Sequence, residues 1–197
     1  MSTIAWTRRK AILIFGSAIV VAVGLYFGIQ YMRGAFDDVD MERVKSTVVV
    51  ALDARKNAAV TPGEADTLHP LTPDQLDMKY AAAEARLRVL FTGSALDDEL
   101  FGLNNEREAE RDMNARIVGG GGRVLEWNSV DVDGDTAHAT GLGEGWLDTA
   151  YPDADGQYTV GPGYSQAHFD TELHRRSERD WIVTDLQLTF DVPGYRP

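Results

Sequence analysis

Residues 128–137 read NSVDVDGDTA. This stretch could form either a calcium-binding loop between helices or a turn between two strands, and the two alternatives predict different folds. Aspartates at every second position from Asp131 onward also begin a calcium loop of the EF-hand kind. Such a loop needs glycine at position six and glutamate at position twelve, and counting from Asp131 these places hold Thr136 and Leu142. Asp-Gly between two alternating strands is instead a strong hairpin signal, because glycine accepts a positive φ at no steric cost. The aspartates therefore predict a hairpin and no metal site.

The segments around this hairpin predict a meandering antiparallel sheet. Residues 123–132, 136–149, 157–173 and 181–192 are rich in β-branched and aromatic residues and are separated by short turns. The run GLGEG at 141–145 lies inside the second of these strands. Glycine has no side chain to hold the pleat, so this run predicts bulges and a sharply bent sheet.

Three helices are predicted before the strands. Apolar residues recur at helical spacing between residues 41 and 55, and a second helix should begin at the capping box formed by Thr72 and Gln75. A third helix is predicted from about residue 96 to 118, ended by the four glycines 119–122. Helices followed by consecutive strands favour the α+β class, with a helical half packed on a curved antiparallel sheet.

Residues 11–31, AILIFGSAIVVAVGLYFGIQY, carry no charge and are long enough to cross a bilayer as a helix. A cleaved signal peptide is the rival interpretation, but its apolar stretch should be shorter and should end at a small-residue cleavage site. We expect an uncleaved anchor. Gly24 and Gly28 form a GxxxG spacing that would allow two such helices to approach closely.

The anchor predicts the domain organisation and the location of the protein. Three basic residues precede the segment and one follows it, which places the N-terminus in the cytoplasm and the C-terminal domain outside. The expected parts are a cytoplasmic N-terminus, a transmembrane helix, a short linker, an extracytoplasmic domain and a tail, at residues 1–10, 11–32, 33–37, 38–192 and 193–197.

Charge and composition exclude several function classes. The formal net charge is −12 and the chain has no cysteine. Nucleic-acid binding needs a basic face, so no nucleic-acid partner is expected, and thiolate chemistry is excluded. The sequence also lacks a P-loop, a GxGxxG fingerprint, a GxSxG elbow and an HExxH motif. No cofactor is expected.

The order of elements resembles the NTF2-like superfamily of cone-shaped, SnoaL- or cystatin-like domains. The resemblance lies in the helical half, in strand ends such as VDVDGDTAHATG (130–141) and in the closing strand RDWIVTDLQLTF (179–190). With an N-terminal anchor, the chain is similar to bacterial Mce-associated proteins and VirB8-type subunits. This resemblance implies an assembly role in a cell-envelope complex, whereas the enzymatic relatives enclose a pocket with an acid/base pair.

The third strand supplies the candidates for such a pair. In SQAHFDTELH (165–174), alternate residues such as Phe169 face one side of the strand, and His168 and Asp170 face the other. A solvated outer face is the simpler interpretation. If the polar row points into the cone instead, His168, Asp170 and His138 are the candidate catalytic residues.

Trp127, Trp146 and Trp181 are candidate residues of a ligand pocket, although large aromatic residues on strands usually pack in the core. Two functions remain open. The first is a non-catalytic interaction component of an envelope transport or secretion complex, whose partners are other membrane or envelope proteins, the lipid bilayer through residues 11–31, and a second copy through the transmembrane helix. The alternative is a cone that binds a small ligand or acts as an enzyme.

Overall fold

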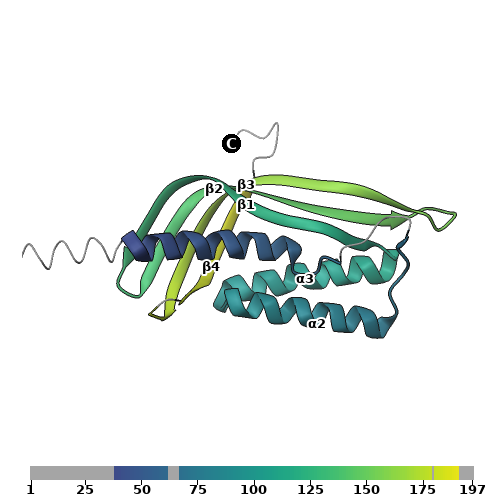
Figure 1. The fold of residues 1–197 in the computed structure, drawn as a ribbon, viewed down its shortest axis with the longest axis horizontal. Coiled ribbons are helices and arrows are strands. Elements are labelled where there is room, and N and C mark those ends of the chain that lie inside the picture. The colour runs from purple at the N-terminus through teal and green to yellow at the C-terminus, as the bar shows by residue number, and fades with distance from the viewer. Residues whose placement is uncertain (1–37, 62–66, 179, 191–197) are drawn as a thin grey trace, which may run out of the picture. The chain divides into compact units, whose positions relative to one another are not determined.

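The computed structural model describes residues 38–61, 67–178 and 180–190 (Figure 1). The chain divides into two compact units, residues 1–40 and 41–197, and the architecture below is that of the second unit. Residues 38–57 are helical. They are followed by α2 (Pro73–Leu90), α3 (Gly93–Met113), β1 (Arg116–Asp133), β2 (Thr136–Pro152), β3 (Tyr158–Ser177) and β4 (Asp180–Phe190). The predicted α+β class is confirmed.

The four strands form one antiparallel meander in the order β1-β2-β3-β4. The hairpin predicted from the aspartate run is confirmed, with Asp133 paired to Thr136. Gly134 occupies the turn with a φ of 59°, which a residue with a side chain rarely adopts. The strand order therefore follows the chain order, and every connection in the sheet is a hairpin.

The sheet is bent, and the bend lies where the glycines of β2 predicted it. The register of β1 against β2 shifts at three places, two of which lie opposite residues 140–143 of β2. Each shift inserts a bulge that increases the local twist. In Figure 1 the sheet curves around the helices, so that one face is concave and covered by helices and the other is convex.

The first two helices confirm their predictions. On the helix 38–57, Val44, Val48 and Leu52 are buried in the core, as the apolar stripe indicated. At the start of α2 the Thr72 hydroxyl accepts a hydrogen bond from the Gln75 backbone N–H, and the Gln75 side chain accepts one from the Thr72 N–H. This reciprocal capping box satisfies two backbone donors that the helix itself leaves unpaired.

The prediction for the third helix was wrong at both ends. The helix α3 begins at Gly93 and ends at Met113, where Asn114 takes the left-handed conformation with a φ of 50°. Asparagine tolerates this conformation at a helix C-terminus almost as glycine does. Residues 116–118 and the four glycines therefore lie in β1, which begins at Arg116.

The four glycines lie in a strand instead of ending a helix, and two of them, Gly120 and Gly122, pack against a helix backbone. Gly119 and Gly121 instead face the side chains of Asp148 and Trp146 on β2. A β-carbon on Gly120 would lie 2.1 Å from the backbone oxygen of Lys56, and one on Gly122 would lie 2.4 Å from that of Leu52. Atoms essentially never approach so closely, so only glycine admits the helix 38–57 at this distance. The Asp53 carboxylate accepts a hydrogen bond from the Gly122 N–H at 3.1 Å and fixes the register. The helix 38–57 thus packs directly on the backbone of β1 at Gly120 and Gly122.

The predicted anchor, residues 11–31, and the GxxxG pair Gly24 and Gly28 lie outside the described residues. Within the described ranges, none of the helices combines the length and the apolar character that a bilayer span requires.

Candidate functional site

The concave side of the fold contains a group of charged residues, which we name the interior charged cluster. Its members come from the helix 38–57, from α2, from α3 and from the start of β1. They are Arg55, Lys56, Lys79, Tyr80, Glu99, Glu106, Glu110 and Arg116. Buried charges are costly unless they are paired, so a cluster of this size needs a structural or functional reason.

The acids of the cluster come from one stripe of α3. Ala95, Glu99, Leu103, Glu106 and Glu110 follow one another at intervals of three or four residues, the spacing of a single helix face. Ala95, Glu99, Leu103 and Glu110 are buried. The sequence therefore carried a signal for a partly charged buried face in these intervals, which the sequence analysis missed.

Glu110 is the centre of the paired part of the cluster. Its side chain is 1% exposed and accepts two hydrogen bonds from the Lys79 ammonium, at 2.5 and 2.7 Å. It also accepts the backbone N–H of Ile117 at 2.7 Å, and the Arg116 Nε lies 3.9 Å away. Glu110 thereby ties α2, α3 and the first residues of β1 together.

The second part of the cluster faces the sheet. Arg55 donates its Nε–H to Glu99 at 2.9 Å, across the boundary between the helix 38–57 and α3. Lys56 and Glu106 lie close enough for each to shift the pKa of the other, yet neither forms an ion pair or hydrogen bond with the described part of the chain. Burial lowers the pKa of Lys56, and the neighbouring Arg55 guanidinium lowers it further.

Burial raises the pKa of Glu106 from its usual 4.5 to about 7, although Lys56 and Lys79 oppose the shift. Between these two pH values the folded state binds more protons than the unfolded state, so stability should fall as pH rises from about 4.5 to about 7 and then level off. Replacing Glu106 by Gln should remove this component, which amounts to roughly 3 kcal/mol at 1.36 kcal/mol per pKa unit.

Urea unfolding of both proteins at several pH values measures the difference. A Glu108→Gln variant, changed at an exposed position on the same helix, is the control and should keep the pH dependence of the natural chain. Parallel pH profiles for the natural chain and the Glu106→Gln variant would contradict the assignment.

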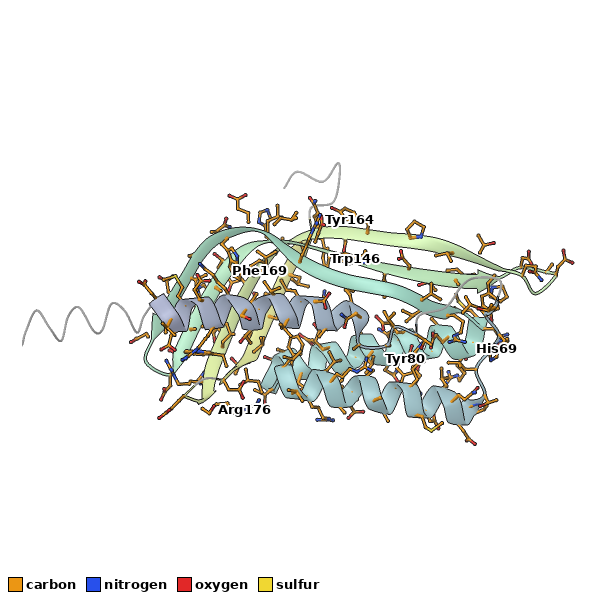
Figure 2. All side chains as sticks on the ribbon, in the orientation of Figure 1. His69, Tyr80, Trp146, Tyr164, Phe169 and Arg176 are labelled. Carbon is orange, nitrogen blue, oxygen red and sulfur yellow. The ribbon has the colours of Figure 1, made fainter. Side chains whose placement is uncertain are left out.

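Tyr80 on α2 completes the cluster (Figure 2). Its side chain is buried, and within the described ranges its hydroxyl has no acceptor at hydrogen-bonding distance and angle. Burial raises the pKa of this phenol, and the negative charges of Glu110 and Glu106 raise it further. Tyr80 therefore stays protonated at any physiological pH.

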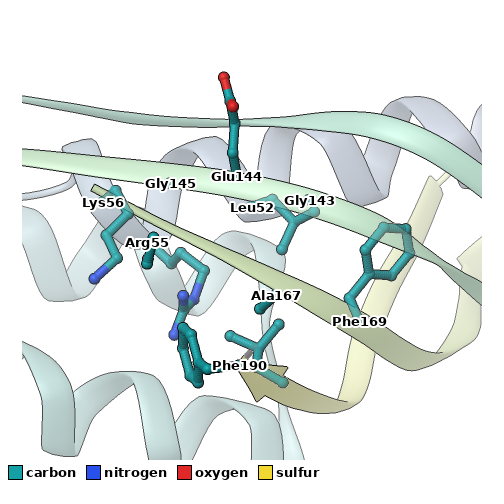
Figure 3. A pocket seen from close by; sticks show the side chains of 11 residues that line it. Leu52, Arg55, Lys56, Gly143, Glu144, Gly145, Ala167, Phe169 and Phe190 are labelled. Carbon is teal, nitrogen blue, oxygen red and sulfur yellow. The ribbon is translucent and has the colours of Figure 1, made fainter. Parts of the chain in front are cut away.

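A small pocket lies between the helix 38–57 and the concave face of the sheet (Figure 3), and we name it the sheet pocket. Its volume is about 30 Å³. Enzyme and ligand sites usually measure about 300–1,000 Å³, so this pocket has no room for a complete organic substrate. Arg55 and Lys56 bring the interior charged cluster to its wall, opposite Phe169 of β3.

The three candidate catalytic residues lie on the other side of the sheet. His168 and Asp170 are exposed on β3, whereas Phe169 between them is buried on the concave side. The structure joins His138 to Asp170, with 2.7 Å between the His138 Nε2 and the carboxylate. Their side chains are 45% and 59% exposed. The simpler interpretation of the polar row, a solvated outer face, matches these positions.

His138 also borders an open surface groove of about 360 Å³ at the end of the β1–β2 hairpin. The groove is lined on its polar side by Asp131, Asp133, Glu172 and His174. Over the described ranges no group of three or more histidine, aspartate or glutamate side chains is arranged to hold a metal ion.

The three candidate tryptophans are separated by the structure. Trp127 packs edge-to-face on Phe169, with 5.5 Å between ring centroids, and Trp181 is buried beneath the Arg175 guanidinium, which lies 4.6 Å from its ring centroid. Trp146 lies over Gly121, whose β-carbon would come within 2.5 Å of its ring. None of the three lines the sheet pocket.

A polar and aromatic group occupies the convex face around Glu144, and we name it the convex cluster. Glu144 pairs with Arg123 on β1 and accepts the Tyr164 hydroxyl at 2.5 Å, and Gln166 donates to that hydroxyl at 2.7 Å. The hydrogen bond from Tyr164 lowers the pKa of Glu144. Tyr164 remains 62% exposed. Its side chain is thus held in place while its ring faces solvent.

No protein-family model and no curated protein matches the chain. Among solved structures it is weakly similar to CagV, a VirB8 homologue of the T4SS of Helicobacter pylori strain 26695. The TM-score is 0.38 at 10% identity, over 75% of this chain and 99% of that one. The intermembrane space region of the chloroplast protein ARC6 gives 0.34 at 12% identity, over 63% and 98%. An Ntf2-like protein involved in plasmid conjugation gives 0.36 at 9% identity, over 77% of this chain and 51% of that one.

Proposed function

We propose that this protein is a non-catalytic assembly component of a cell-envelope transport or secretion complex. In this proposal residues 11–31 anchor it in the membrane, and the α+β unit is an NTF2-like cone on the extracytoplasmic side. The observation that carries the proposal is the small size of the sheet pocket. The concave face is covered by the helix 38–57, and the pocket there measures about 30 Å³. This pocket has no space to enclose a whole substrate.

The positions of the acid/base candidates support the same conclusion. Catalytic acids and bases usually lie in sites that exclude water, because charges interact more strongly there. His138 and Asp170 instead form a pair on the open convex face. The alternative, an enzymatic cone that uses His168, Asp170 or His138, would need these residues on the concave side.

The convex cluster is the surface that we propose for partner contact. Tyrosine, tryptophan and arginine are the residues that most often dominate binding energy. Tyr164 and Arg123 belong to the convex cluster, and Trp146 is paired with Tyr164 on the neighbouring strand. Tyr164 is already oriented by Glu144, so little side-chain freedom is lost on binding.

The charge of this face indicates the chemistry of the partner. Five acidic side chains lie on the convex side of β1 to β3, and Arg123 of the convex cluster pairs with one of them, Glu144. They are Glu126, Asp131, Glu144, Asp170 and Glu172. We therefore propose a partner protein that presents a basic surface, because complementary charges speed encounter and set the orientation of the two proteins.

Photocrosslinking in native membranes tests the proposal. A photoreactive amino acid replaces Tyr164, and the matched control carries it at Tyr151, which is also exposed but lies at the end of the β2–β3 hairpin. After the membranes are washed with alkaline carbonate, the chain should remain in the pellet and position 164 should yield a defined adduct that position 151 does not. Loss of the chain in the wash would contradict the anchor. Equal or absent adducts at both positions would contradict the docking surface.

A further inference from the structure

The sheet pocket contains hydrogen-bond donors without matching acceptors. Lys56 has an ammonium with three N–H groups, and it donates none of them to a residue in the described ranges. Arg55 donates its Nε–H to Glu99, and its other guanidinium N–H groups donate to none of those residues. Ser165 also lines the pocket, and its hydroxyl forms no hydrogen bond within the described part of the chain. An excess of donors is the chemistry of a site for an anion.

The size and walls of the pocket limit what the anion can be. A cavity needs about 10–15 Å³ per water-sized group, so a pocket of about 30 Å³ accommodates roughly two such groups. Gly143 and Gly145 provide the space on β2, while Leu52, Phe169 and Phe190 form apolar walls. A ligand that places two oxygen atoms in the pocket and an apolar part beside these walls is a carboxylate on an aliphatic chain. A phosphate or sulfate would place additional charged oxygens against apolar side chains.

The acids near the pocket decide how an anion would bind. Glu99 is paired with Arg55. Glu106 on α3 forms no ion pair within the described ranges, and the charges of Lys56 and Lys79 both act to lower its pKa. Glu144 belongs to the lining strand, but its carboxylate bonds to Arg123 and Tyr164, and in Figure 3 it points away from Arg55 and Lys56. Glu106 is thus the competing negative charge.

We propose that the sheet pocket binds the carboxylate group of a larger molecule, held by Lys56, Arg55 and Ser165, with the attached aliphatic chain leaving the pocket along the half-exposed ring of Phe190. The group comes either from a free short-chain acid or from the C-terminus of a peptide. The site is separate from the convex cluster, so it does not depend on the docking proposed there.

Protonation of Glu106 removes the competing charge and should strengthen binding. Because burial raises the pKa of Glu106 to about 7, the affinity for a carboxylate should increase as pH falls through that value. Lys56 has a lowered pKa, and its partial deprotonation at alkaline pH weakens binding in the same direction.

Isothermal titration of the full chain in detergent micelles tests the proposal. The probes are butanoate, chloride at equal ionic strength as the control anion, and a trialanine peptide with either a free or an amidated C-terminus. We expect butanoate to bind at about pH 6 and to bind about tenfold more weakly at about pH 8, since one charge-assisted contact is worth roughly that factor. If the natural ligand is a peptide C-terminus, trialanine with a free carboxylate should bind and the amidated trialanine should not. If butanoate binds and neither peptide does, the natural ligand is a free acid.

Lys56→Met is the decisive variant, and Lys45→Met on the same helix is its matched control. Lys45 pairs with Glu42 outside the pocket, so its replacement should leave the affinity unchanged. Lys56→Met should reduce butanoate affinity at least about tenfold without unfolding the protein, because methionine relieves the burial of an ammonium. Glu106→Gln should retain binding at both pH values. Unchanged affinity in Lys56→Met, or equal binding of chloride and butanoate, would overturn the proposal.

Discussion

Replacing Gly120 by valine should destabilise the protein by about 3 kcal/mol or more, the upper range for inserting atoms into a packed contact. The added β-carbon would lie 2.1 Å from the Lys56 backbone oxygen, which belongs to a helix and cannot rotate away as a side chain can. The helix 38–57 must then lift from β1, and its buried residues Val44, Val48 and Leu52 lose part of their packing. Urea unfolding of the full chain, followed by tryptophan fluorescence, measures the loss.

Other glycines of the chain provide matched controls for this effect. Gly161 on β3 has the Thr149 oxygen at 3.7 Å from an added β-carbon, an ordinary contact, so Gly161→Val should change stability by less than about 0.5 kcal/mol. Gly102 on α3 has no neighbour within 4 Å, and Gly102→Ala should stabilise the helix by about 0.5–1 kcal/mol. If Gly120→Val behaves like Gly161→Val, the docking of the helix on the glycines is not as close as described.

Replacing Glu110 by alanine should cost about 3–5 kcal/mol of stability, the range found when one partner of a buried ion pair is removed. The variant leaves the Lys79 ammonium without its carboxylate, and the Ile117 N–H without its acceptor. Lys79 is 11% exposed, so water does not compensate for the loss. The junction between α3 and β1 should open first, which hydrogen exchange at the Ile117 amide would detect.

Two variants separate the charge of Glu110 from its hydrogen bonds. Glu110→Gln keeps an acceptor for the Ile117 N–H but loses the charge, and should cost about half as much. Glu108→Ala removes an exposed acid from the same helix and should stay within about 0.5 kcal/mol of the natural chain. Equal unfolding free energies for Glu110→Ala and Glu108→Ala would show that the buried pair does not hold this junction.

The elements that were predicted well are those whose signals lie within a few residues of one another. The Asp133–Gly134 hairpin and the Thr72–Gln75 capping box each depend on backbone groups less than one turn apart. Alternation along residues 165–174 also correctly placed Phe169 inside and Asp170 outside, since a strand directs successive side chains to opposite faces.

The failure at residues 114–122 has a physical cause. A run of glycines usually ends a helix, because glycine readily adopts positive φ there, and locally nothing distinguishes a stop from a strand. What selects the strand is a helix that precedes it by some sixty residues, with Asp53 bonded to the Gly122 N–H. The true stop was Asn114, a single residue with a weaker signal.

In the candidate site, too, some residues could be identified from the local sequence and others only from the packing of distant segments. The local pattern identified the titratable residues of β3, which the fold places on the solvent side. The residues of the interior charged cluster belong to four separate segments, and only packing brings Lys56, Glu106 and Glu110 together. The pKa shifts of Lys56 and Glu106 arise from burial, a property that no short stretch of sequence possesses.

The sequence by itself thus determined the α+β class, the Asp133–Gly134 hairpin, the capping box of α2 and the two faces of β3, because these depend on short-range backbone geometry and on periodicity. The tertiary structure alone decided which glycines admit a helix, which face of the bent sheet is covered, and which acids of α3 are buried. Those properties depend on contacts between segments far apart in the chain, whose distances are set only when the whole domain has packed.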